Sequence, residues 1–382
     1  MAEAAVVIVQ DSAGVELVYS AEPLSLGSDD GWSVSPVPIL EVCPDPFDSA
    51  AVLHRVVGAT VFPDGRVAIA NLGDNTIRFH EATGELLGKV GGSGQGPGEF
   101  RQLRWLVRRQ DELWAVQILP LPVNVFDLQG NYLRSVSMPP VMGPQFRGFL
   151  ADGSAVATVP YRVSYARSST DSAAVVRFGP SGTDTIVVLP SLRRIAIPGF
   201  GAEVQALGPH LHVTTGDDLV YASFSSDWDV GVWREGVLVR RIRRGGAPIP
   251  VTREHRAAYR DALLREAGDD PGARGAYEML ADNMIYPDHH PMHSRLLVDS
   301  SGFLWVERPQ TEPPWSEAID YAPVPPHPSL WDVFSPEGAW LSTVEYPARF
   351  RVLEIGDSYV IGVARDDLDV EAVQVWGLKR VR

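Results

Sequence analysis

One pattern recurs five times along this chain of 382 residues and constrains its fold more than any other feature. Each copy has a large apolar residue, a glycine three to five positions later, and another apolar residue six positions after the glycine. Repetition of such a short pattern at intervals of about 50 residues predicts an architecture of repeated small sheets. The copies are Phe79, Gly84 and Val90; Phe126, Gly130 and Val136; Phe178, Gly182 and Val188; Trp233, Gly236 and Ile242; Phe334, Gly338 and Val344.

Each copy is typical of a β-hairpin. The residues before the glycine alternate in polarity, as in 76–79, which indicates a strand with one buried face. The glycine provides the positive φ that a tight turn requires, and a second strand follows it. A further apolar pair with a turn precedes several copies, at 61–70, 149–156 and 297–306. Four strands per unit are typical of one blade of a β-propeller.

The interval between the fourth and fifth copies is about twice as long as the others, and residues 251–285 account for the excess. Thr252 is a suitable N-cap for a segment with apolar residues at four-residue spacing. Asp270, followed by Pro271, begins a second segment of this kind. We therefore predict two helices inserted between the fourth and fifth blades.

The two ends of the chain are expected to complete one blade together. The C-terminal unit contains three predicted strands, and residues 37–42 supply the fourth, which removes an open sheet edge. A hairpin within 5–20 is expected outside the ring. The prediction is an all-β, six-bladed β-propeller with four-stranded blades, formed as a single domain by residues 1–382. The predicted blades are 53–100, 101–140, 145–192, 205–245, 292–346, and 348–382 together with 37–42.

Charge and cysteine content disfavour several classes of protein. The 48 acidic and 33 basic residues give a net charge of −15, and so acidic a surface disfavours binding to nucleic acid or to anionic lipid. No segment has the ~20 apolar residues of a membrane span, and no secretory leader is recognisable. The only cysteine, Cys43, excludes an internal disulfide and is expected to be buried as a small apolar residue.

The first repeat unit resembles a known repeat family. Residues 71–79 read Asn-Leu-Gly-Asp-Asn-Thr-Ile-Arg-Phe, and residues 90–100 read Val-Gly-Gly-Ser-Gly-Gln-Gly-Pro-Gly-Glu-Phe. Residues 53–105 are similar to the NHL-type repeat of six-bladed β-propellers, and the chain resembles bacterial six-bladed propeller proteins of undefined function. The resemblance implies an extracytoplasmic protein but no particular reaction, because NHL-type relatives include scaffolds, lyases with histidine-bound metal and calcium-dependent lactonases. None of their ligand motifs matches this chain residue by residue.

The glycine-rich run 91–98 is not expected to bind phosphate. A phosphate-binding loop presents backbone amides at the start of a helix, whereas a strand-like segment follows this run. The run is interpreted as a connection between two blades, where several residues need positive φ.

Histidines form the first candidate site. His210, His212, His290 and His293 lie near the predicted starts of two adjacent inner strands, where loops of neighbouring blades meet at the central channel. His290 and His293 are predicted to be catalytic, and His210, His290 and His293 to be ligands of a divalent metal. Metal-free acid–base catalysis is one alternative. The other is that these histidines are polar channel residues without a chemical role.

Arginines form the second candidate site, because guanidinium groups aimed at one axis create a local positive potential that suits carboxylate, phosphate or sulfate. Four of them lie within predicted inner strands, at Arg104, Arg147, Arg295 and Arg351. Arg295 is predicted to be catalytic, and the other three, with His212, to bind substrate. The alternative is that each arginine pairs with a buried acid such as Glu307 or Glu354.

Acidic turns are expected on the same face, at 74–75, 227–229 and 366–371. Carboxylate oxygens at several angles are suitable calcium ligands, although solvated hairpin tips have the same composition. A divalent metal, zinc or calcium, is therefore left open as a cofactor.

These features favour a small-molecule hydrolase with its site at the top of the central channel. The predicted substrate is an anionic or ester-like molecule, namely an ester, lactone or phosphoester, and the metal would assist hydrolysis. Two alternatives remain open. One is a non-catalytic binding propeller that uses exposed aromatics such as Trp315 and Tyr321. The other is a histidine-dependent lyase.

Overall fold

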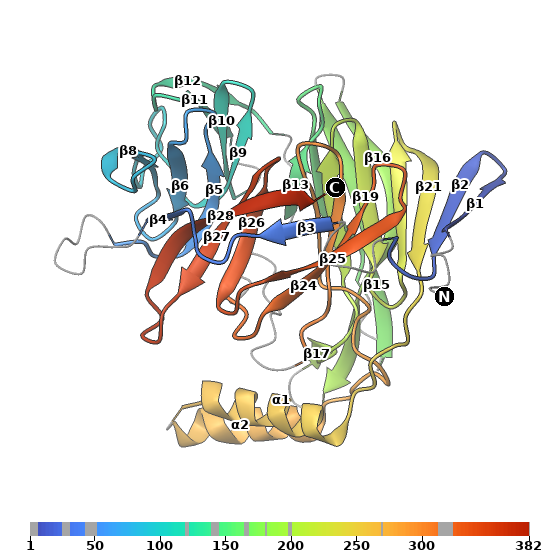
Figure 1. Ribbon diagram of the computed structural model, residues 1–382. Coiled ribbons are helices and arrows are strands. Elements are labelled where there is room, and N and C mark those ends of the chain that lie inside the picture. Colours follow the sequence, from blue (N-terminus) through green and yellow to red (C-terminus); the bar gives the residue numbers. More distant parts are fainter. Residues whose placement is uncertain are drawn as a thin grey trace.

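The computed structural model describes residues 7–24, 31–42, 52–118, 122–138, 145–163, 168–179, 182–197, 201–268, 270–311 and 324–381. Within these ranges the strands form six sheets, built mainly from antiparallel neighbours along the chain. Figure 1 shows the sheets arranged side by side with the two helices at one end. The predicted all-β propeller fold is confirmed.

The strands of the first three sheets follow the chain order. The first sheet contains β5 (Val56–Val61), β6 (Val67–Asn71), β7 (Thr76–His80) and β8 (Leu86–Gly91). The second contains β9 (Leu103–Arg109), β10 (Glu112–Gln117), β11 (Val123–Asp127) and β12 (Tyr132–Val136). The third contains β13 (Gln145–Phe149), β14 (Ala155–Arg162), β15 (Ser168–Gly179), β16 (Gly182–Ile197) and β17 (Gly201–Val204).

The fourth and sixth sheets also receive strands from the N-terminal region. The fourth contains β18 (Leu211–Gly216), β19 (Leu219–Phe224), β20 (Asp229–Arg234), β21 (Val237–Arg244), β2 (Val15–Ser20) and β1 (Val7–Ser12). The fifth contains β22 (Arg295–Val298), β23 (Leu304–Glu307), β24 (Ser329–Phe334) and β25 (Trp340–Tyr346). The sixth contains β26 (Phe350–Ile355), β27 (Tyr359–Arg365) and β28 (Glu371–Val381), with β3 (Gly31–Val34) and β4 (Leu40–Val42).

The five glycines of the repeated pattern all adopt positive φ, as the hairpin interpretation requires. Such a backbone conformation places the Cβ of other residues too close to the backbone, so glycine is the residue that permits the turn. The φ angles are 90° at Gly84, 88° at Gly130, 127° at Gly182, 79° at Gly236 and 92° at Gly338.

The innermost strands of the sheets contact one another in a closed sequence. Contacts join β5 to β9, β13 to β18, β18 to β22, β22 to β26, and β26 back to β5. The remaining junction is aromatic, because the rings of Trp105 in β9 and Phe146 in β13 lie 5.3 Å apart. The sheets therefore form a ring, which brings the starts of distant inner strands to one end.

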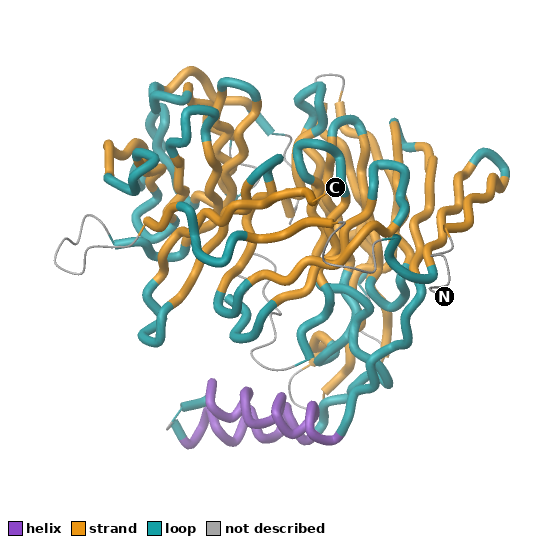
Figure 2. The backbone as a smooth tube through the Cα atoms, viewed as in Figure 1, coloured by secondary structure: helices purple, strands orange, loops and turns teal. Residues whose placement is uncertain are grey.

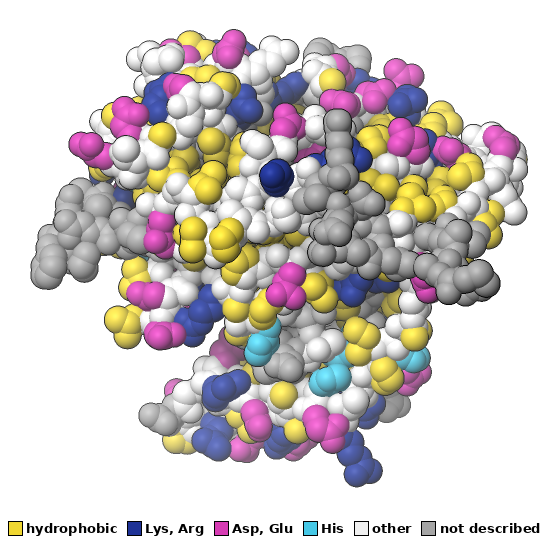
Figure 3. Space-filling model, in the orientation of Figure 1, with side chains coloured by type: hydrophobic (Ala, Val, Ile, Leu, Met, Phe, Trp, Pro, Cys, Tyr) yellow, Lys and Arg dark blue, Asp and Glu magenta, His cyan; other side chains and the backbone are white. Residues whose placement is uncertain are grey.

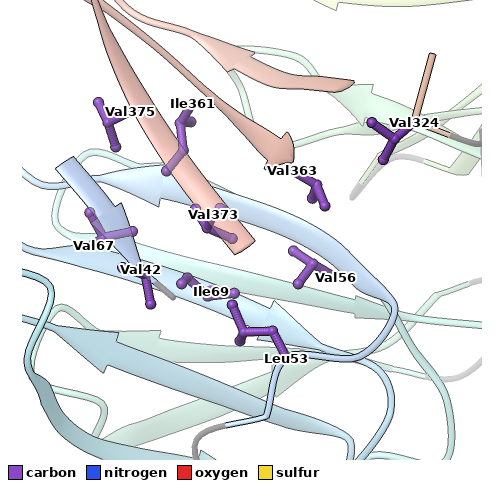
Figure 4. Packing of buried hydrophobic residues seen from close by; sticks show 11 residues of the cluster. Val42, Leu53, Val56, Val67, Ile69, Val324, Ile361, Val363, Val373 and Val375 are labelled. Carbon is purple, nitrogen blue, oxygen red and sulfur yellow. The ribbon is translucent and has the colours of Figure 1, made fainter. Parts of the chain in front are cut away.

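The ring closes through the N-terminal region, as predicted. The closing strand β4 pairs antiparallel with β28, with Val42 opposite Val373. It begins at Leu40, later than the predicted 37–42. A second strand, β3, pairs with the C-terminal half of β28 and is not predicted from the sequence. Figure 4 shows the apolar contacts at this closure, where Val42 and Val373 pack with Val67 and Ile69 of the first sheet.

Three sheets have more than the predicted four strands, the sixth because both β3 and β4 pair with β28. In the third sheet β15 and β16 run for 12 and 16 residues, and β17 adds a fifth strand, so the sheet extends beyond the predicted limit at 192. The predicted N-terminal hairpin is present as β1 and β2. It lies on the outer edge of the fourth sheet, where β2 pairs parallel with β21.

Both predicted helices are present and begin at the predicted caps. Thr252 caps α1 (Arg253–Glu266), and Asp270 caps α2 (Pro271–Asp282), which has proline at its first position. Tyr259 of α1 packs with Ala206 and Leu207, just beyond β17, and Figure 2 shows the helices below the strands. No helix in the described ranges has the length and apolar character of a membrane span.

Replacement of Glu371 by glutamine should weaken ring closure. Glu371 is 5% exposed; its Oε2 accepts a 2.8 Å hydrogen bond from Val56 N–H, and its Oε1 pairs with Arg365 at 2.7 Å. The change removes a charge-assisted contact between the first and last sheets, so we expect the free energy of unfolding in urea to fall by about 2 kcal/mol. Glu345→Gln on an exposed site is the control, with an expected change below about 0.5 kcal/mol. Equal stabilities would contradict this account of the closure.

Candidate functional site

The predicted arginines and His212 all lie at the beginnings of inner strands. Arg295 is the first residue of β22, while His212 and Arg351 are the second residues of β18 and β26. Arg147 is the third residue of β13. Because the inner strands neighbour one another around the ring, their starts lie at the same end. Arg104 holds the matching position in β9, and its participation in the site stays a prediction.

Electrostatic interactions connect four of these residues. Burial lowers the pKa of His212 well below its ordinary value, and the nearby His293, His210, Arg147 and Arg295 lower it further. Burial likewise lowers the pKa of Arg351 to about 10, and Arg295 has the largest effect of the charged neighbours. Arg147, His212, Arg295 and Arg351 therefore share one environment, although they come from four different sheets. We call these four residues together with Glu307 the axial cluster.

The arginines of the axial cluster are held in place by neighbouring strands. Arg295 Nη2 donates to the carbonyl oxygen of Val352 at 2.9 Å, and Arg351 Nη2 donates to that of Val56 at 2.9 Å. Each bond joins one sheet to the next. These contacts fix the guanidinium groups before any ligand arrives, which favours preorganised binding of an anion.

Glu307 is the acidic member of the axial cluster. It lies opposite Arg295 in the pairing of β22 with β23, and it is 7% exposed. Burial raises the pKa of its carboxyl group, against the opposing effect of Arg295 and Arg351. From the sequence, Glu307 is expected only as a structural partner of arginine. Glu354, the other such candidate, instead accepts hydrogen bonds from Thr60 and Tyr359.

His293 lies behind His212 and is completely buried. Its Nε2 is 2.8 Å from Ser223 Oγ, and that hydroxyl donates its own hydrogen to the carbonyl oxygen of Asp229. Ser223 must therefore accept from His293, which fixes the imidazole with its proton on Nε2. Burial, with Arg244 nearby, lowers the pKa of His293 to about 3. The rings of His212 and His293 are 5.2 Å apart, so His293 supports His212 from the interior.

His290 belongs to a different part of the structure. Its Nε2 is 2.8 Å from Nδ1 of His255 on α1, and that Nδ1 already accepts from Thr252 N–H. His290 must therefore donate, and burial lowers its pKa to about 4. It lines a cavity of about 170 Å³ together with Arg193, Pro209 and Asp288. Figure 3 shows histidine side chains at the surface where the helices meet the sheets.

Two of the three predicted metal ligands bond to different parts of the structure. His210, His290 and His293 were expected to converge, but His293 is bonded within the fourth sheet and His290 to the helical insertion. In the ranges that the structure describes, no group of three or more His, Cys, Asp or Glu side chains is arranged to hold a metal ion. The two side chains have different partners, Ser223 and His255, and a zinc or calcium ion bound by this histidine set stays a prediction.

The acidic turns are satisfied by internal partners. Asp74 accepts hydrogen bonds from Asn71, Thr76 and Arg78, and Asp229 pairs with two arginines. Asp366 accepts two backbone N–H groups of its own turn. Internal contacts of this kind are typical of acidic residues at the tips of hairpins. Cys43, Trp315 and Tyr321 lie outside the described residues.

The glycine-rich run adopts the predicted role of a connection between two sheets. Glu99 Oε2 accepts a hydrogen bond from Gly96 N–H at 2.7 Å and lies against Gly94, so a carboxylate of the chain occupies the loop. Asn124 Nδ2 donates to the carbonyl oxygen of Glu99, which ties the loop to the second sheet.

Comparisons with solved structures find likeness of fold at low sequence identity. A protein of Bacteroides fragilis described as exported has 12% identity and a TM-score of 0.51, over 96% of this chain and 100% of that one. A Bacteroides vulgatus member of the DUF4221 family has 9% identity and a TM-score of 0.52, over 92% and 100%. A virginiamycin B lyase of Staphylococcus aureus has 13% identity and a TM-score of 0.44, over 91% and 99%. No family model and no curated protein matches the sequence.

The buried neutral His293 should make the protein less stable in acid. Below the ordinary pKa of 6.5 the unfolded chain binds a proton at this histidine, whereas the folded chain does so only near 3. The unfolded state thus binds more protons in this window, so the free energy of unfolding falls as pH decreases from 6.5, by up to ~1.4 kcal/mol per pH unit.

Urea unfolding between pH 5 and pH 7.5 measures this slope. His293→Gln should reduce it, while His289→Gln at an exposed position of the same loop should leave it unchanged. Identical slopes in the wild type and in His293→Gln would show that His293 does not titrate in this way.

Proposed function

We propose that this protein is a small-molecule hydrolase whose site is the axial cluster, acting on an anionic ester, lactone or phosphoester. The observation that carries the proposal is the convergence of Arg147, His212, Arg295 and Arg351 beside the buried carboxyl group of Glu307. Cationic groups and one carboxyl group of raised pKa at a single place are typical of sites that bind an anion and move a proton.

Substrate binding is assigned to Arg147 and Arg351, with Arg104 as a further predicted contact. A guanidinium group binds a carboxylate or phosphate through two parallel hydrogen bonds, and such bonds are stronger in a buried site than in water. His212 is neutral near pH 7 because its pKa is lowered, so it offers one donor and one acceptor without adding positive charge. His293 keeps the ring of His212 in position from behind.

The hydrolytic step is assigned to Glu307 and Arg295. In its carboxylate form Glu307 takes a proton from water while the water oxygen forms a bond to the carbonyl carbon or phosphorus. Arg295 stabilises the negative charge that develops on the substrate oxygen. The bond to the leaving oxygen then breaks, and Glu307 returns the proton to the departing alcohol. A raised pKa makes the carboxylate of Glu307 a stronger base than an exposed glutamate.

A binding function without turnover is the second candidate. Arg295 and Arg351 each donate one hydrogen bond to a backbone carbonyl, so part of their capacity already serves the structure. A site of this kind can retain an anion without chemistry. The lyase alternative uses histidine as the base, and the lowered pKa of His293 and of His290 makes each of them a weak one.

The protein is also proposed to act outside the cytoplasm. The resemblance to exported propeller proteins and the likeness of fold to the Bacteroides fragilis protein described as exported support this. Fractionation of cells that express the full-length protein tests it, with recovery in the cytoplasm alone as the opposing result.

Glu307→Gln should abolish hydrolysis but not binding. A panel of chromogenic esters bearing a carboxylate, lactones and phosphoesters identifies the substrate class, and kcat is expected to fall at least about 100-fold because glutamine cannot take the proton. Arg295→Gln should lower kcat/KM by a factor of about 100 through loss of oxyanion stabilisation.

The control is Arg234→Gln, since Arg234 is exposed and paired with Asp218 away from the axial cluster. It should leave kcat and KM unchanged. Saturable anion binding that Arg295→Gln removes, without turnover of any substrate, favours the binding candidate. Turnover that persists in Glu307→Gln overturns the assignment of the base.

A further inference from the structure

A second polar cavity lies beside the fifth sheet, between β23 and β24. Its volume is about 190 Å³, and its polar lining side chains are Arg308, Gln310, Thr311 and His327. Arg308 is the residue next to Glu307, but it takes no part in the axial cluster described above.

Alternation along the strand separates the two sites. Successive side chains of a strand point to opposite faces, so Glu307 and Arg308 face different neighbouring sheets. Trp305, on the Glu307 side, packs with Phe350 of the sixth sheet. Val306, on the Arg308 side, packs with Val230 of the fourth sheet. The cavity is therefore associated with the interface of the fourth and fifth sheets.

Arg308 is anchored rigidly at this interface. Its Nε and Nη2 donate to the carboxylate of Asp332, the shortest contact being 2.8 Å, and Nη2 also donates to Thr343 Oγ1. Asp332 is completely buried. These bonds fix the plane of the guanidinium group. Its remaining nitrogen, Nη1, has no hydrogen-bond partner in the part of the chain that the structure describes.

Among the residues that the structure describes, the charges at this interface do not balance. Asp332 also pairs with Arg244, at 3.1 Å, so two guanidinium groups share one carboxylate. Arg244 lies between the rings of Trp228 and Trp340, at 5.0 and 4.8 Å. A cation held in such an apolar setting without its own counter-ion is costly, and a bound anion reduces that cost.

We propose that the cavity at Arg308 is a second binding site, which takes a small oxyanion. The expected ligand carries a carboxylate or phosphate group, which the guanidinium group of Arg308 binds. Gln310 and Thr311 supply neutral donors. This site is independent of the proposed hydrolase, because it lies on the other face of β23 and uses none of the residues of the axial cluster.

Calorimetric titration of the full-length protein with inorganic phosphate, and separately with acetate, tests the proposal. The wild type should show saturable binding of phosphate, of acetate or of both. The ion with the higher affinity identifies whether the site prefers a phosphate or a carboxylate group. Arg308→Gln should weaken that binding at least 10-fold, since glutamine lacks the positive charge of the guanidinium group. It leaves Arg244 and Asp332 as a balanced pair, so the variant should fold, which urea unfolding verifies.

Two matched variants locate the bound anion. Arg351→Gln removes a cation of the axial cluster, and Arg234→Gln removes an exposed one. Neither should alter the binding that Arg308→Gln weakens. Absence of saturable binding by phosphate and acetate, or equal weakening in Arg234→Gln, would overturn the proposal. Equal weakening in Arg351→Gln would also overturn it, because that result would place the bound anion at the axial cluster.

Discussion

The structure depends on the pairing of β28 with two short N-terminal strands. Without β3 and β4 the last sheet would end in an open edge, and the first sheet would lose the apolar contacts that Val42 shares with it. The hydrogen bond from Val56 to the buried Glu371 joins the same two sheets. Because the inner strands contact one another in a closed ring, this junction helps to fix their positions and those of the side chains at their starts.

The repeating part of the fold could be predicted because local chemistry determines it. A glycine with positive φ marks each hairpin, and Thr252 and Asp270 mark the two helix starts. The strands that escaped prediction, or that paired differently, depend on distant partners. Gly31–Val34 is a strand only because β28 extends far enough to pair with it, and β2 joins β21 in parallel, which no local pattern encodes.

The candidate site shows the same division between local and distant information. The local sequence predicts that four residues lie at inner-strand starts, namely Arg147, His212, Arg295 and Arg351. Their convergence follows from the ring. The local sequence does not determine the directions in which the side chains of His290 and His293 point. Only two residues separate them, yet one bonds to α1 and the other to Ser223, because a loop containing Pro291 does not have the fixed direction of a strand.

The N-terminal segment crosses the outside of three sheets, and this has a consequence for biosynthesis. It pairs with β21 through β2, bonds to β25 through Leu24, and pairs with β28 through β3 and β4. A ribosome makes this segment before its partner strands at 237–244, 340–346 and 371–381, which emerge much later. The segment must therefore wait with unpaired strand edges while the sheets form. Closure of the ring therefore requires the earlier synthesis of β28 and is a late event in folding.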